Sequence, residues 1–111
     1  MSDKLFIVTR ADLPPGARAA QSAHTALAFA FDHPALAAEW HGQSNNIVLL
    51  EAPDERALVE LWRRAWDAGV PYSVFTEPDM GDATTGVAIG PAGHRLVSSL
   101  PLTLREPKRA A

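Results

Sequence analysis

The chain has 111 residues, a length at which one hydrophobic core suffices, so we expect a single domain over residues 1–111. Apolar residues make up 47% and charged residues 21% of the chain, ordinary values that argue against a disordered or membrane-embedded protein. The absence of cysteine excludes disulfide bonds and thiolate chemistry. We find no signal peptide and no membrane span, which together predict a cytoplasmic location.

The net charge of −3 argues against a protein that coats nucleic acid, because non-specific phosphate binding needs an extended basic surface. The charges are unevenly distributed, however. Carboxylates are concentrated in residues 51–82, whereas Lys4, Arg10, Arg18 and the basic residues of the tail lie near the two ends. A local basic patch is therefore compatible with the sequence.

The first half of the chain is predicted to form a strand, two helices and a second strand. Residues 5–10 begin with a β-branched apolar run, typical of a strand that is buried on both faces. Residues 11–16 are a loop with two prolines, and a helix is expected over residues 17–31. Apolar residues at spacings of three and four predict its buried face: Ala20, Ala23, Leu27, Ala30 and Phe31. A short second helix is expected over residues 34–40, with Gly42 just past its end.

The second half begins with a strand over residues 46–50 and a helix that opens at residues 52–55 and ends at Gly69. The apolar face of this helix comprises Leu58, Leu61, Trp62 and Ala65. The remaining segments are strands over residues 71–76 and 84–89, a break at 90–93, a short helix or edge strand within 96–104, and a frayed tail over 105–111. This order predicts a three-layer α/β fold with a mixed sheet of about four strands and helices on both faces.

Two loops of this fold carry the candidate site. In open α/β sheets, ligands bind beyond the carboxyl ends of the strands, which is where residues 11–16 and 77–82 are expected. Gly16 and the free amides of the first helical turn can hold an anion, although the same loop is also consistent with a plain turn. The chain has neither a Gly-rich dinucleotide fingerprint nor a Walker lysine.

His24 is the candidate for proton transfer, because histidine is the side chain best suited to it near neutral pH. Its helical position beside Ala20 and Leu27 is equally compatible with a histidine that only packs. Glu77 and Asp79 flank a proline in a rigid loop, where two neighbouring carboxylates can take different pKa values. The alternative is that Asp79 caps a turn while Glu77 is solvated.

Other residue patterns are less informative. Thr84 and Thr85 begin a strand, where threonine is common for structural reasons alone. The other histidines lack the paired spacing of metal ligands, so we expect no metal: His33, His41 and His94. The tryptophans follow helical spacing and are expected in a core or interface: Trp40, Trp62 and Trp66.

Several segments together resemble the peptidyl-tRNA hydrolase type 2 family, with their order largely kept between residues 5 and 104. The matching segments are residues 7–13 (IVTRADL) with Gly16, 19–24 (AAQSAH), 40–43 (WHGQ), 52–55 (APDE) and 84–91 (TTGVAIGP). The resemblance implies hydrolysis of the ester between a peptidyl group and the 3′ end of tRNA, without a cofactor, by an often dimeric α/β protein. It carries the helix histidine of the family onto His24, its glutamine onto Gln21 and its strand threonine onto Thr85.

The sequence departs from the family pattern in two loops. The family's Gly-Lys-Gly-Lys segment is about two residues shorter here and reads Gly16-Ala17-Arg18. An arginine can bind phosphate or polarise a carbonyl, but it cannot shuttle a proton as a lysine can. The family's Asp-Ala-Gly segment becomes residues 77–79 (EPD) in a loop about four residues shorter, so Glu77 replaces the aspartate and Asp79 is a second candidate.

These residues lead to the hypothesis that His24 activates a water assisted by Glu77 or Asp79, while Thr85 hydrogen-bonds the water or substrate. We assign substrate binding to Arg10, Gly16, Arg18, Gln21 and Thr84, with the tRNA 3′ end as partner. One alternative is a catalytically impaired relative that binds a ligand or partner as a homodimer. Another is a structural homodimer module built on the helix that carries two tryptophans.

Overall fold

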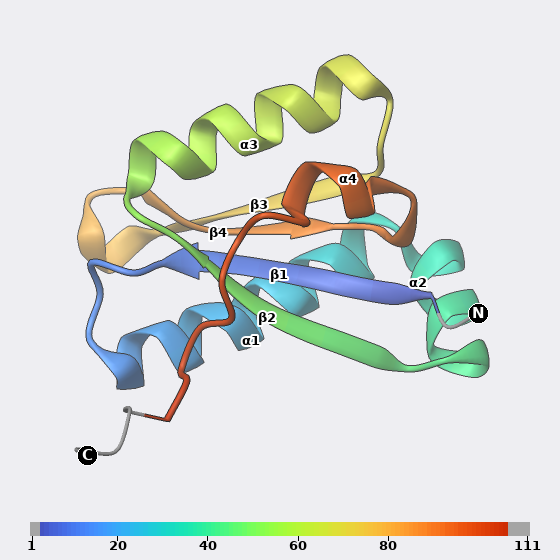
Figure 1. The fold of residues 1–111 in the computed structure, drawn as a ribbon, viewed down its shortest axis with the longest axis horizontal. Coiled ribbons are helices and arrows are strands. Elements are labelled where there is room, and N and C mark those ends of the chain that lie inside the picture. The colour runs from blue at the N-terminus through green and yellow to red at the C-terminus, as the bar shows by residue number, and fades with distance from the viewer. Residues whose placement is uncertain (1–2, 107–111) are drawn as a thin grey trace.

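The computed structural model describes residues 3–106 as a three-layer α/β domain with a mixed four-stranded sheet (Figure 1). The strands are β1 (Lys4–Arg10), β2 (Asn46–Ala52), β3 (Tyr72–Glu77) and β4 (Ala83–Ile89), in the order β2-β1-β4-β3. The helices are α1 (Pro15–Asp32), α2 (Pro34–Gln43), α3 (Glu55–Ala68) and α4 (His94–Val97), with 3₁₀ turns η1 (Pro78–Met80) and η2 (Pro91–Gly93). The predicted fold class is therefore confirmed.

The strand directions gather three strand ends at one edge of the sheet. β1 runs parallel to β2, and β4 runs antiparallel to both β1 and β3. Consequently β1, β2 and β3 all finish at the edge where α1 and β4 begin, on the left of Figure 1. This is the edge at which open α/β sheets bind ligands.

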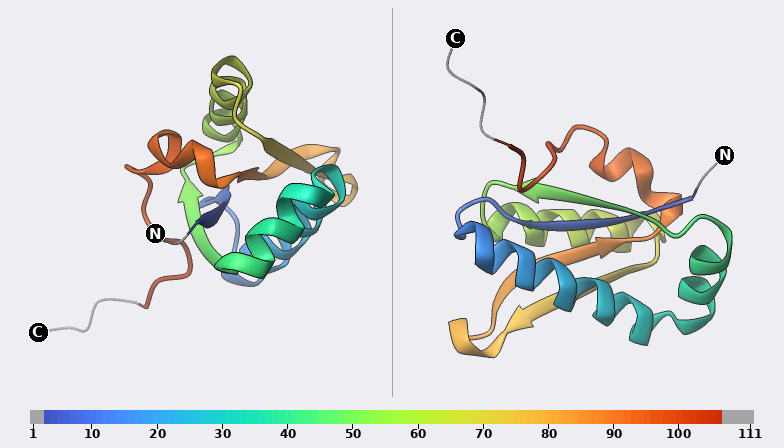
Figure 2. Two further views of the ribbon diagram at one scale, coloured as in Figure 1. Left: turned by 90° about the vertical axis from the view of Figure 1, so that its right-hand side faces the viewer. Right: turned by 90° about the horizontal axis from the view of Figure 1, so that it is seen from below.

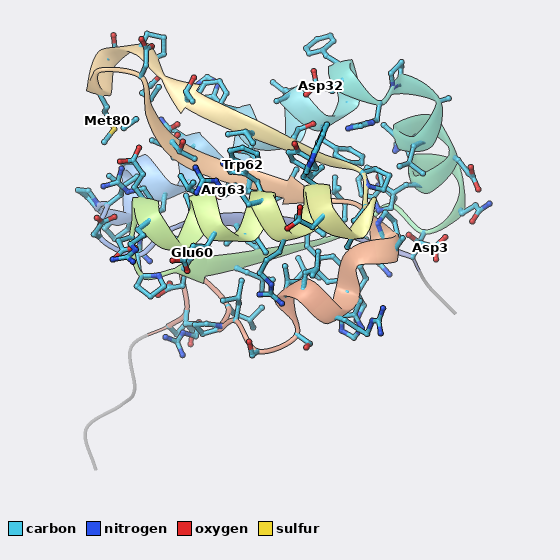
Figure 3. All side chains as sticks on the ribbon, turned by 90° about the horizontal axis from the view of Figure 1, so that it is seen from above. Asp3, Asp32, Glu60, Trp62, Arg63 and Met80 are labelled. Atoms are coloured by element: carbon cyan, nitrogen blue, oxygen red, sulfur yellow. The ribbon has the colours of Figure 1, made fainter. Side chains whose placement is uncertain are left out.

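Each face of the sheet is covered by its own pair of helices (Figure 2). On the α3 and α4 face, alternate residues such as Phe6 and Val8 of β1 pack with Leu58 and Leu61 of α3 in an apolar core. Trp62, labelled beside α3 in Figure 3, packs against this core, and its ring stacks on that of Tyr72 with the centroids 6.0 Å apart. On the α1 and α2 face, the apolar core is smaller and centres on Leu5, Ile7, Phe29 and Ala88.

The predicted buried face of α1 is wrong. The helix buries Gln21, Ser22, Thr25 and Phe29 instead, and it leaves Leu27 57% and Phe31 80% exposed. The reason is that the sheet beneath the first half of α1 presents the side chains of Thr85 and Glu77, both of which bond to Gln21. Ser22 and Thr25 bond to backbone carbonyls of α1 itself. Polar groups that leave water need hydrogen-bond partners, so Gln21 turns inward to supply them.

Helix α3 has the ends that its sequence predicts. The Asp54 side chain accepts a hydrogen bond from the Ala57 N–H at 2.9 Å, which caps the first turn. Gly69 takes a left-handed conformation with φ of 68° just after the helix, as expected for a C-terminal glycine. Trp62 is half-buried, whereas Trp66 is 70% exposed.

Two further segments differ from the prediction. Helix α2 continues through Gly42 to Gln43. Residues 96–104, predicted as one helix or edge strand, contain the end of α4 and then an antiparallel bridge between Leu102 and Leu50 of β2. That bridge covers part of the outer edge of β2. The predicted tail over residues 105–111 lies outside the described residues beyond 106. No helix within residues 3–106 is both long and apolar enough to span a membrane.

Candidate active site

Gln21 is the centre of a hydrogen-bonded chain that joins α1 to β3 and β4. Its side-chain Nε2 donates to Glu77 Oε1 at 3.2 Å, and its Oε1 accepts from Thr85 Oγ1 at 2.6 Å. The Thr25 hydroxyl donates to the backbone carbonyl of Gln21 at 2.6 Å. Gln21 is 5% exposed, and Thr25 and Thr85 are fully buried, so these bonds are shielded from water. These hydrogen bonds fix the orientation of the Gln21 side-chain amide, and the amide in turn fixes the position of the Glu77 carboxylate.

A β-bulge places Thr85 in this chain. The pairing of β3 with β4 matches Phe75 to Gly86 and then Thr76 to Thr84, so Thr85 is an extra residue on β4. Strict alternation from Val87, which faces α3, would send Thr85 to the same face. The bulge turns Thr85 toward α1 instead, where its hydroxyl reaches Gln21.

His24 lies one turn further along α1, exposed at the surface. Its ring stacks on that of Phe75, with the ring centroids 4.9 Å apart and the planes within 8° of parallel. Phe75 and Glu77 lie two residues apart on the same face of β3, so His24 and the carboxylate of Glu77 are neighbours along this strand. Asp79 lies on η1 and is exposed. The structure thus brings Gln21, Glu77 and Thr85 into direct contact and places His24 beside them.

The guanidinium of Arg18 is held by hydrogen bonds to other residues of the protein. Its Nε donates to the Leu13 carbonyl at 2.9 Å, and its Nη1 lies 3.1 Å from both Glu51 Oε1 and Thr103 Oγ1. The side chains of Arg18 and Glu51 are only 16% and 15% exposed. Arg18 therefore ties the loop before α1 to β2 and to the C-terminal segment. Beside it lies a cavity of about 810 Å³ that is lined by Arg18, Glu51 and residues 104–106, among others.

Arg10 forms a two-pronged ion pair with Asp12, with both nitrogen–oxygen distances at 2.9 Å. The hydrogen bond to Arg10 holds the pKa of Asp12 below its ordinary value, and the same bond raises the pKa of Arg10. Arg10 also approaches the carbonyl of Thr84 at 3.5 Å. Thr84 itself is buried, and its backbone N–H donates to Glu55 Oε2 at 2.7 Å.

Gly16 is exposed in the first turn of α1, which has no side-chain cap. The first N–H to bond within the helix is that of Arg18, which donates to the Pro14 carbonyl. Among residues 3–106 there is no group of three or more His, Asp or Glu side chains arranged to hold a metal ion.

The profile of the family described as Peptidyl-tRNA hydrolase PTH2 matches residues 3–106. The chain belongs to the peptidyl-tRNA hydrolase PTH2 family. Among curated proteins, no significant match is found.

Two loops adjoin the candidate site. The loop before α1 is held by Arg18 and its bonds to Leu13 and Glu51. After β3 the chain forms η1, and Glu77, at the end of β3, bonds to Gln21.

Four residues of the candidate site were missed in the sequence: Thr25, Glu51, Phe75 and Thr103. The sequence pattern could have indicated two of them. Glu51 is a charged residue directly after the apolar run of β2, and Phe75 lies two residues from Glu77, on the same face of β3. Thr103 gave no such signal, because its contact with Arg18 spans 85 positions of sequence.

Proposed function

We propose that this protein hydrolyses the ester bond of peptidyl-tRNA, with an N-blocked aminoacyl-tRNA as its simplest substrate. Membership of the PTH2 family supports this activity. The observation that carries the proposal at the residue level is the buried chain from Thr85 through Gln21 to Glu77, which ends beside the exposed ring of His24. A buried polar chain of this kind holds its terminal groups in fixed positions.

In the proposed mechanism, His24 takes a proton from a water molecule, and the resulting hydroxide attacks the carbonyl carbon of the ester. The bond between that carbon and the ribose 3′ oxygen then breaks, and the protonated His24 returns its proton to the leaving oxygen. The products are a peptide with a free carboxylate and a tRNA with a free 3′ hydroxyl. Stacking on Phe75 limits the orientations of His24.

Glu77 is the better candidate for the carboxylate that assists His24. Its Oε1 accepts a hydrogen bond from the fixed amide of Gln21, whereas Asp79 is exposed on η1. Glu77 also lies about 7 Å along β3 from Phe75, on the side that faces His24. This spacing leaves room for a water molecule that contacts both side chains.

The remaining substrate contacts fall to groups at the start of α1. The exposed amides of the first turn, beginning at Gly16, favour the oxyanion or the terminal phosphate of the tRNA. Arg10 and Arg18 add positive charge here, although each is partly neutralised by its own carboxylate partner. A homodimeric state stays a prediction of the family resemblance, and sedimentation of the purified protein measures it. A cytoplasmic location stays a prediction from the sequence.

The test is hydrolysis of N-acetylated aminoacyl-tRNA by the wild type and by His24→Ala, Glu77→Gln and Thr85→Val. We expect His24→Ala and Glu77→Gln to lower kcat/KM about 100-fold or more, as for the loss of a general base or its partner. Thr85→Val should lower kcat/KM less, because Thr85 acts on the site only through its hydrogen bond to Gln21. Asp79→Asn is the matched control and should change kcat/KM by less than about threefold.

Two results would count against this proposal. If the wild type leaves the ester intact, the activity is excluded; if His24→Ala retains full activity, the mechanism is wrong. A binding module without hydrolysis is the second candidate, favoured by the bonds that Arg18 makes within the protein where the family carries lysines. That function predicts tRNA binding by a wild type that shows no hydrolysis.

A further inference from the structure

Helix α1 exposes an uncharged stripe along its whole length, which we call the α1 stripe. It comprises Gly16, Ala20, Ala23, Leu27 and Phe31, at successive spacings of four, three, four and four residues. Leu27 is 57% and Phe31 80% exposed. The only charged side chain between Gly16 and Phe31 is that of Arg18, which is bonded to Glu51 beneath the helix. Surface helices ordinarily carry charge on this side.

A continuous exposed apolar surface on a soluble domain is typical of a docking site. The α1 stripe is not compensated by an apolar buried side, because the covered face of α1 contains Gln21, Ser22 and Thr25. In its first half, the helix therefore buries polar residues and exposes uncharged small ones, the reverse of the usual amphipathic pattern. The polar side serves the buried chain of the candidate active site, and the apolar side is left for a partner.

The α1 stripe is continuous with the candidate active site. His24 follows Ala23 directly and lies one helical turn from both Ala20 and Leu27, so it borders the stripe. Any molecule that covers the stripe near Ala23 also covers His24. A second copy of the chain seated there would close the site, whereas a substrate would occupy both surfaces at once.

The chemistry of the α1 stripe selects one part of the substrate. The tRNA is a polyanion, and the stripe offers it no cation, since Arg18 faces the other way. The peptidyl part is an uncharged backbone with side chains that are frequently apolar. From His24 to Phe31 the helix rises about 10 Å, a distance that an extended peptide crosses in about three residues.

We propose that the α1 stripe between His24 and Phe31 docks the peptidyl moiety of the substrate, in an extended form, through its apolar side chains. This inference rests on the proposed hydrolysis of peptidyl-tRNA at His24. On this proposal, Leu27 and Phe31 contact the peptide away from the ester bond and favour substrates with longer peptides. A substrate with a single N-acetylated amino acid ends before these residues, whereas one with four amino acids reaches them.

The experiment compares hydrolysis of N-acetyl-leucyl-tRNA with that of an N-acetylated tetraleucyl-tRNA. We expect the wild type to show a kcat/KM about tenfold higher for the longer substrate, as for the burial of one apolar side chain. The double variant Leu27→Ser/Phe31→Ser should lose this preference while it hydrolyses the short substrate as the wild type does. Both positions are exposed, so the fold should be kept, which far-ultraviolet circular dichroism checks.

Trp66→Ser is the matched control. Trp66 is also a large exposed apolar residue, but it lies on α3, which covers the opposite face of the sheet from α1 (Figures 2 and 3). This variant should keep the wild-type preference for length. A tetraseryl substrate tests the chemistry of the contact, and the wild type should hydrolyse it little faster than the short substrate.

The possible outcomes separate the two proposals. Hydrolysis of both leucyl substrates at equal efficiency by the wild type would overturn the docking proposal and leave the activity in place. If the double variant keeps the preference for the longer substrate, the docking proposal is likewise overturned and the activity stays in place. Hydrolysis of neither substrate overturns both proposals. If the wild type sediments as a dimer that Phe31→Ser dissociates without any change in length preference, the stripe is an interface between copies and the docking proposal is wrong.

Discussion

Two arginines at the carboxyl edge of the sheet are each bonded to a carboxylate, Arg10 to Asp12 and Arg18 to Glu51. The pairs differ in their surroundings. Asp12 is 43% exposed, so its pair is screened by water, whereas both side chains of the Arg18 pair are largely buried. The Arg10 side chain is itself only 15% exposed, so water reaches that pair chiefly at Asp12. The Arg18 pair is a structural link.

The Arg10 pair should give the stability of the protein a dependence on pH at acidic values. Because the folded pKa of Asp12 is lowered, chiefly by its hydrogen bond to Arg10, the contribution is complete above the unfolded pKa of about 4. It is lost as the pH falls through the lower folded pKa. Asp12→Asn should reduce the free energy of unfolding by about 0.5 kcal/mol at pH 7, a value limited by exposure.

Urea unfolding of the wild type and Asp12→Asn at a series of pH values measures this difference. The two curves should converge as the pH falls below about 4. A difference that stays constant down to the most acidic pH would show that the pair does not act through the charge of Asp12.

At the scale of elements, the closeness of α1 to β4 depends on a missing side chain. A Cβ on Gly86 would lie 1.8 Å from Thr25 Oγ1 and 2.9 Å from Thr25 Cβ. Gly86 is also the residue after the bulge at Thr85. The same glycine therefore lets α1 approach the sheet and keeps Gln21 within reach of Thr85.

Gly86→Ala should lower the free energy of unfolding by about 2 to 3 kcal/mol, because Thr25 and the backbone of α1 must move to admit the methyl group. Thermal or urea unfolding gives the value. Gly16→Ala is the matched control, since a Cβ there meets no atom within 4 Å, and it should leave stability unchanged or slightly raised. Thr25→Ala in the Gly86→Ala background should restore part of the loss; purely additive losses would contradict a direct clash.

Over the whole molecule, Arg18 connects three segments that are distant in sequence. The C-terminal segment runs along β2, where the Glu51 N–H donates to the Pro101 carbonyl and the Thr103 N–H to the Leu49 carbonyl. Arg18 bonds to the side chains of both Glu51 and Thr103. The start of α1, the end of β2 and the C-terminal segment are therefore held as one unit beside the candidate active site.

Arg18→Gln should reduce the free energy of unfolding by about 2 kcal/mol, because it leaves the carboxylate of Glu51 without its charged partner. It should also speed amide hydrogen exchange at Thr103, whose side chain loses the same contact. Arg95→Gln replaces an exposed arginine on α4 and serves as the control, with little effect expected. Unchanged exchange at Thr103 in Arg18→Gln would mean that the backbone bonds alone hold the C-terminal segment.

Much of the fold could be predicted because its signals are local. The apolar β-branched runs, the proline and glycine positions and the capping Asp54 all act over a few residues, and they give the strands and α3 correctly. Gln21, Glu77 and Thr85 were identified as site residues through the resemblance. Their joint contact could not be derived, because Gln21 and Thr85 are 64 positions apart and meet only through a bulge.

The sequence by itself determined the three-layer α/β class and the family, since both depend on residue type and local spacing. The tertiary structure alone decided which side of α1 is buried. Hydrophobic periodicity favoured Leu27 and Phe31, yet Glu77 and Thr85 of the sheet beneath the helix needed Gln21 as a partner. The physical reason is that an unsatisfied buried polar group costs more than an exposed apolar side chain, and only the register of β3, β4 and α1 shows where those groups lie.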